Sequence, residues 1–190
     1  MSKANKTDFV QNNKHKHNDR KESNGAGRYN GNRRIAICGV FIALAMILSY
    51  LESLVPLSFV VPGIKLGLAN LVTIVSLMKL GLGSTVIISA GRIILSGILF
   101  GNPMVIIYSL AGAALSIVVM CVVKQLKIFT ITGVSICGAV SHNAGQLMVA
   151  AFVLENTNIL YYMTVLVISG TIAGAVIGIM AAYVLKNIRF

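Results

Sequence analysis

The chain has 190 residues, which is enough for one domain. Hydrophobic residues make up 56% of the chain and charged residues 11%, whereas a typical soluble domain has about 25% charged residues. This composition excludes an ordinary soluble domain and predicts an integral membrane protein whose main solvent is lipid.

The N-terminal tail, residues 1–32, is rich in Lys, Asn, His and Gly and has little apolar surface to bury, so we predict that it is disordered. Residues 1–34 contain nine Lys or Arg and three Asp or Glu, which is +6 of the net charge of +11. A basic tail beside a membrane span is typical of an orientation signal and of contact with anionic lipid. We therefore predict a cytoplasmic tail at residues 1–32, a transmembrane domain at residues 33–190 and no nucleic-acid partner.

Six apolar segments follow the tail, and each has close to the roughly 20 residues that a spanning helix needs. They are residues 35–54, 64–80, 84–100, 104–123, 128–154 and 160–185. Basic residues precede the first segment and recur in every second loop, with Lys65 as the one exception. This alternation is typical of an even number of spans. We predict an all-α bundle of six transmembrane helices with both termini in the cytoplasm.

Arg92 stands near the middle of the third segment, where a charge is costly and usually functional. Thr85 and Ser89 lie seven and three residues before Arg92, and Ser96 lies four residues after it. These offsets place all four residues on one helix face. The pattern predicts that Arg92 binds an anionic group in a cavity. The structural alternative is an ion pair with a glutamate, or a side chain that extends to the membrane surface.

The fifth segment carries a second polar set, His142, Asn143 and Gln146, with Ser135 on the same helix face as His142 and Gln146. Polar groups need partners inside a membrane. We expect this set to bind a ligand, and the alternative is a group of hydrogen-bonded core residues.

Other polar residues mark the remaining segments: Asn70 lies in the second, Tyr108 in the fourth, and Glu52 at the outer end of the first. The loop at residues 53–63 contains two prolines and could cover an outward-facing site. No GxxxxGK[ST] motif is present, so ATP hydrolysis would need other subunits. The segments offer too few metal ligands, so we expect no metal and no cofactor.

Small residues recur on two segments. Gly170, Gly174 and Gly178 form a stripe on the sixth, and Gly39 and Ala43 form a pair on the first. Such stripes let helices approach closely. They predict either packing within the monomer or contact with a partner subunit.

Four motifs stand in order along the chain: SYLESLVP at residues 49–56, VPGIKLGLAN at 61–70, FGNPM at 100–104 with YSLAG at 108–112, and GAVSHNAGQ at 138–146. Together they resemble the Gx transporter family, which is also catalogued as heptaprenyl diphosphate synthase component I, over about residues 33–185. In size and hydropathy this family is similar to the S components of energy-coupling factor transporters, which are six-helix binders of vitamins or metals.

The resemblance implies an S-component-like subunit in a prokaryotic plasma membrane that captures an anionic or amphipathic solute, such as a vitamin or quinone precursor. S components dock on a coupling subunit, which carries two ATPases, through an Ala-xxx-Ala pattern that Gly39 and Ala43 match only in part. The residues expected to contact the solute are Arg92, His142, Asn143, Gln146, Asn70, Glu52, Ser89 and Tyr108.

The catalogued name implies an alternative function, as a component of heptaprenyl diphosphate synthase in isoprenoid or menaquinone synthesis. Prenyl synthases hold Mg²⁺ and diphosphate with Asp-rich motifs, and no Asp occurs from residue 35 onward. We therefore expect a non-catalytic role if the alternative holds. A third hypothesis is a structural membrane subunit whose sixth segment recruits partners.

Overall fold

The computed structural model describes residues 31–54, 67–100, 103–155 and 157–187, and these residues are almost entirely helical. The all-α prediction is confirmed for the described part of the chain. The tail predicted at residues 1–32 and the loop predicted at 53–63 lie almost wholly outside the described residues. The chain divides into two units, residues 1–39 and 40–190, and the N-terminal helix, Gly31–Leu54, begins in the first and ends in the second.

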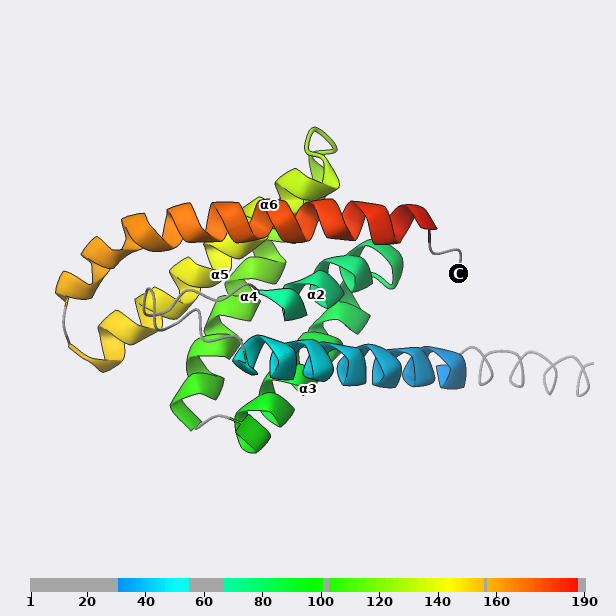
Figure 1. Ribbon diagram of the computed structural model, residues 1–190, viewed down its shortest axis with the longest axis horizontal. Coiled ribbons are helices and arrows are strands. Elements are labelled where there is room, and N and C mark those ends of the chain that lie inside the picture. The colour runs from blue at the N-terminus through cyan, green and yellow to red at the C-terminus, as the bar shows by residue number, and fades with distance from the viewer. Residues whose placement is uncertain (1–30, 55–66, 101–102, 156, 188–190) are drawn as a thin grey trace, which may run out of the picture. The chain divides into compact units, whose positions relative to one another are not determined.

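The second unit continues with six further elements (Figure 1). They are α2 (Leu68–Lys79), α3 (Leu82–Phe100), α4 (Pro103–Gln125), α5 (Ile131–Val153), the 3-10 helix η2 (Thr157–Tyr162) and α6 (Met163–Asn187). Local chemistry explains several of the boundaries. Pro103 occupies the first position of α4, where its missing N–H is not needed. Thr130 caps α5 by accepting a hydrogen bond from the backbone of Gly133 at 3.3 Å.

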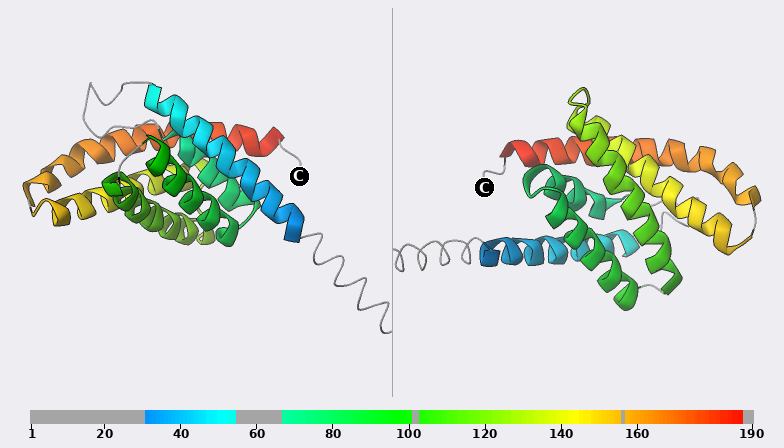
Figure 2. Two further views of the ribbon diagram at one scale, coloured as in Figure 1. Left: turned by 90° about the horizontal axis from the view of Figure 1, so that it is seen from below. Right: turned by 180° about the vertical axis from the view of Figure 1, so that it is seen from behind.

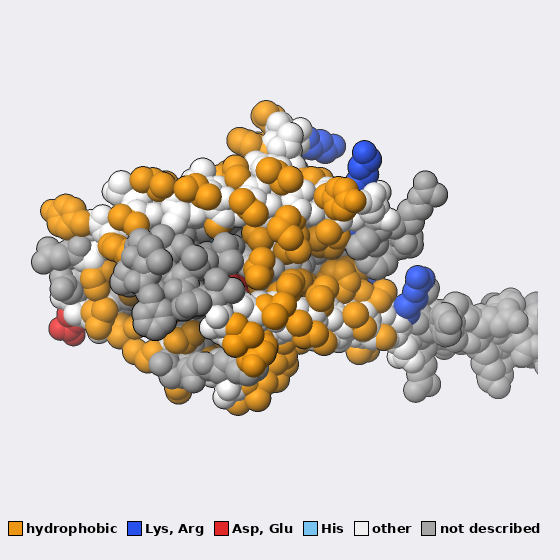
Figure 3. Space-filling model, viewed as in Figure 1, with side chains coloured by type: hydrophobic (Ala, Val, Ile, Leu, Met, Phe, Trp, Pro, Cys, Tyr) orange, Lys and Arg blue, Asp and Glu red, His pale blue; other side chains and the backbone are white. Residues whose placement is uncertain are grey.

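Five of the described helices are long and apolar enough to cross a membrane. They are Gly31–Leu54, Leu82–Leu99, Pro103–Gln125, Ile131–Val153 and Met163–Asn187. Their apolar side chains are not confined to a core, because Ile98 is 70% exposed and Phe152 is 84% exposed. Figure 3 shows apolar side chains over much of the described surface. Exposed apolar surface of this extent is typical of lipid-facing helices.

The second predicted span differs from the others. It is observed as α2, which has 12 residues and a length of about 18 Å, well short of the roughly 30 Å hydrocarbon core. Residues 64–66, where the prediction began, lie outside the described part. Ala69 and every residue from Val72 to Leu77 are buried. The described helix is therefore a core element of the second unit, and the count of six full spans remains a prediction.

Helix α5 lies between α4 and α6 (Figures 1 and 2), and glycines bring the three together. A Cβ added to Gly174 of α6 would stand 2.7 Å from the Cα of Ile136, and one added to Gly178 would stand 2.6 Å from the Cα of Thr132. Gly145 of α5 approaches the backbone of α4 equally closely. The stripe on α6 thus serves packing within the chain, which was one of the two interpretations open from the sequence.

Candidate functional site

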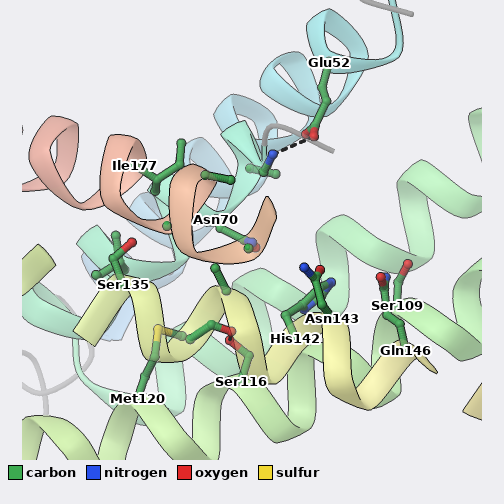
Figure 4. A pocket seen from close by; sticks show the side chains of 18 of the residues that line it. Glu52, Asn70, Ser109, Ser116, Met120, Ser135, His142, Asn143, Gln146 and Ile177 are labelled. Carbon is green, nitrogen blue, oxygen red and sulfur yellow. Dashed lines mark hydrogen bonds between the residues drawn. The ribbon is translucent and has the colours of Figure 1, made fainter. Parts of the chain in front are cut away.

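A polar cavity of about 90 Å³ lies within the second unit, among side chains from the N-terminal helix and from α2 to α6. Several waters or a small charged group would fit in this volume, since one water needs a cavity volume of about 10–15 Å³. Figure 4 shows many of its side chains, with those of His142 and Asn143 facing Asn70. The polar or charged lining residues are Glu52, Asn70, Arg92, Ser109, Ser116, Ser135, His142, Asn143 and Gln146.

Arg92 brings a positive charge to this cavity from α3. Its Nη1 donates a hydrogen bond to Ser49 Oγ on the N-terminal helix at 3.5 Å, which is long for such a bond. Its Nε is buried and has no hydrogen-bond partner among the described residues, and the same is true of Ser96 Oγ one turn further along α3. A buried donor without a partner costs about 1–3 kcal/mol. A ligand oxygen that accepted from Arg92 would remove that cost.

Glu52 is fixed beside α2. Its Oε1 accepts a hydrogen bond from the backbone N–H of Gly67 at 2.6 Å. Gly67 is the N-cap of α2 and has a left-handed backbone with φ 73, a conformation that glycine adopts readily. A carboxylate at a helix N-terminus is stabilised by the positive end of the helix dipole. Glu52 therefore helps to fix the start of the helix that carries Asn70.

The polar residues of α5 contact two different helices, α6 and α4. Asn143 donates its side-chain amide N–H to the carbonyl oxygen of Leu166 in α6 at 3.0 Å. His142 and Gln146 face α4 at Gly112, where an added Cβ would stand 2.7 Å from the His142 carbonyl oxygen and 2.8 Å from Gln146 Cγ. Gly112 therefore permits the close approach of α4 to the backbone of His142 and the side chain of Gln146. Positions 142 and 146 share one side of α5, and position 143 lies on another.

Two predicted site residues do not line the cavity. Ser89 is buried against α2, where its Oγ lies 3.4 Å from Thr73 Oγ1. It belongs to a set of hydroxyls between α2 and α3, in which Ser76 also donates to Thr85 at 3.1 Å. Tyr108 is half-buried but is not among the lining residues. The next residue, Ser109, takes that place, because successive helix positions point about 100° apart.

Ser109 and Ser116 of α4 line the cavity. Ser109 marks the fourth apolar segment beside Tyr108, but neither serine was among the residues predicted to contact the solute. They are seven residues apart, with Gly112 between them, so the three share one face of α4. That spacing is the signal by which these serines could have been found. Ser116 is already engaged, because its Oγ donates to the Gly138 carbonyl oxygen at 2.8 Å.

The predicted docking pair lies on the N-terminal helix, where Gly39 and Ala43 are both exposed. A Cβ on Gly39 would meet no atom within 4 Å. Docking itself remains a prediction.

Chemically, the described lining of the cavity offers one guanidinium, one carboxylate, one imidazole and several amide and hydroxyl groups. This set can bind a polar solute by directional hydrogen bonds and charge. Among the described residues, no three His, Cys, Asp or Glu side chains gather as metal ligands would.

Comparison with known protein families adds one finding. A family model described as heptaprenyl diphosphate synthase component I matches residues 41–184, a range that includes every residue lining the cavity. The resemblance under that catalogued name is thereby confirmed. Comparisons with curated proteins and with solved structures find no match. Because the family model covers more than half of the chain, the chain belongs to the heptaprenyl diphosphate synthase component I family.

Proposed function

We propose that this chain is the substrate-binding membrane subunit of a small-molecule uptake transporter, similar to the S component of an energy-coupling factor transporter. The observation that supports this proposal is that residues predicted from separate segments meet at one cavity. Six residues chosen from the sequence line one cavity although they come from four helices: Glu52, Asn70, Arg92, His142, Asn143 and Gln146. A membrane bundle that served only as a scaffold would have no need to bring a charged pair and several amides together.

In this proposal Arg92 binds an anionic group of the solute. Asn70, His142, Asn143 and Gln146 make directional hydrogen bonds to it, and Glu52 lies at the outer mouth. The solute is anionic or amphipathic, comparable to a vitamin or quinone precursor. Both termini are cytoplasmic, and the chain resides in a prokaryotic plasma membrane. A coupling subunit that docks at Gly39 and Ala43, together with ATPase subunits, supplies the energy.

The experiment begins with mass spectrometry of small molecules that co-purify with the protein in mild detergent. The affinity of the identified solute is then measured for the native protein and for Arg92→Ala. We expect Arg92→Ala to weaken binding by at least about tenfold, the effect of losing one charged hydrogen bond. Lys186→Ala is the matched control, because Lys186 is exposed at the end of α6. Equal affinities in native protein and Arg92→Ala would contradict the proposal, provided that the variant remains folded.

A second candidate function rests on the family description, which names a component of heptaprenyl diphosphate synthase. In that case the chain takes part in isoprenoid synthesis, as a catalytic or non-catalytic subunit. The test is incubation of the purified protein with a prenyl diphosphate, isopentenyl diphosphate and Mg²⁺. Chain elongation would favour the synthase, whereas solute binding without elongation favours the transporter.

A further inference from the structure

The polar cavity contains two opposite charges. Among its described lining residues, Arg92 is the only Lys or Arg and Glu52 the only Asp or Glu. Together the two side chains make the charged part of the described lining neutral, with a positive group on α3 and a negative group on the N-terminal helix.

Each of these two charges contacts a neutral group. Glu52 accepts a hydrogen bond from the Gly67 N–H, and Arg92 donates one to Ser49 Oγ. Among the described residues, the buried Nε of Arg92 has no hydrogen-bond partner. Two opposite charges therefore border one cavity, and each has a neutral hydrogen-bond partner.

A neutral pair of opposite charges discriminates between ligands by net charge. A purely anionic solute would be attracted by Arg92 but repelled by Glu52, and it would leave one uncompensated charge in a medium of low dielectric constant, which is costly. A solute that carries both charges would complement both side chains and leave the site neutral. Such a solute would give each of the two charged side chains a partner of opposite charge.

We propose that the solute is zwitterionic, with its anionic group on Arg92 and a cationic amine or ammonium group on Glu52. This inference rests on the proposed function and narrows its substrate class to molecules with an amino-acid-like pair of charges. Asn70, His142 and Gln146 bind the remainder of the molecule. The volume of about 90 Å³ suits a head group of a few heavy atoms.

The test uses three probes with one carbon skeleton: β-alanine, propionate and propylamine, which are zwitterion, anion and cation. Their affinities are measured by isothermal titration calorimetry for the native protein, Glu52→Gln and Glu155→Gln. Glutamine at position 52 removes the charge but keeps an oxygen that can accept from the Gly67 N–H. Glu155 is exposed and does not line the cavity, so Glu155→Gln is the matched control.

We expect the native protein to bind β-alanine about tenfold more tightly than either singly charged probe, as an added charged hydrogen bond would give. Glu52→Gln should lose that preference over propionate, and Glu155→Gln should keep it. Propionate binding as tightly as β-alanine to the native protein would overturn the zwitterion inference and leave the proposed function standing. A co-purified solute with an anionic group and no cationic group would also overturn the zwitterion inference and leave the proposed function standing. If no probe binds and no solute co-purifies, both proposals fail together.

Discussion

The side-chain amide of Asn143 donates a hydrogen bond to the backbone carbonyl oxygen of Leu166 at 3.0 Å, which ties α5 to α6 at the border of the polar cavity. The same residue was expected from the sequence to bind ligand. Its amide nitrogen is engaged in holding two helices together, and the oxygen of the same amide is an acceptor by its chemistry.

Replacing Asn143 tests this double role. We expect Asn143→Ala to lower the stability of the protein in detergent by about 0.6–1 kcal/mol, as is typical of hydrogen bonds between membrane helices. Asn143→Asp should be worse, because a carboxylate offers no donor to the Leu166 carbonyl oxygen. Thermal unfolding measures both effects. Thr171→Ala is the control, since the exposed Thr171 donates its hydrogen bond within its own helix, to the Val167 carbonyl oxygen at 2.8 Å. Equal losses in Asn143→Ala and in the control would contradict the role in joining α5 to α6.

The glycine stripe on α6 predicts a steric effect. In Gly174→Ala the new methyl group would lie 2.7 Å from the Cα of Ile136, which is backbone and cannot move aside alone. We expect a loss of about 1–3 kcal/mol, as in other overpacked interfaces. In Gly83→Ala the methyl group meets no atom within 4 Å, so this control should be neutral or slightly stabilised by higher helix propensity. A Gly174→Ala protein as stable as Gly83→Ala would show that α5 and α6 do not pack this closely.

Glu52 should matter for structure as well as for binding. Glu52→Ala removes the acceptor of the Gly67 N–H at the start of α2, and we expect a loss of about 1–2 kcal/mol in the free energy of unfolding. Glu52→Gln retains an acceptor and should lose less. The comparison of the two melting temperatures separates the hydrogen bond from the charge. Identical melting temperatures for Glu52→Ala and the native protein would mean that the bond contributes nothing.

The C-terminal end of α2 has a partner of its own. Lys124 Nζ of α4 donates to the Leu77 carbonyl oxygen at 2.8 Å, in the last turn of α2, where carbonyl groups lack partners within the helix. Lys124→Met should therefore destabilise the protein by about 1–2 kcal/mol. Lys186→Met, at an exposed position, should have no measurable effect. Hydrogen exchange at the end of α2 would locate the change, and unaltered protection there would contradict it.

The polar residues on α3 show how far sequence reasoning could reach. Helical spacing correctly placed Thr85, Ser89 and Arg92 near one face, because that spacing depends only on the geometry of one helix. It could not show that Ser89 turns to Thr73 on α2 while Arg92 reaches the cavity. Which neighbour each residue meets depends on how the helices cross. For the same reason the sequence could not show that Ser109, and not the neighbouring Tyr108, lines the cavity.

By itself the sequence determined the all-helical character, the membrane-like composition and the choice of most polar residues that line the cavity, because hydropathy and helical period are local properties. Only the tertiary structure decided that α2 is a short core helix, that the α6 glycines pack against α5, and that Glu52 and Arg92 border one cavity. Those features arise from close approach between segments distant in the chain. No local pattern encodes that approach, because it depends on the packing of all the helices together.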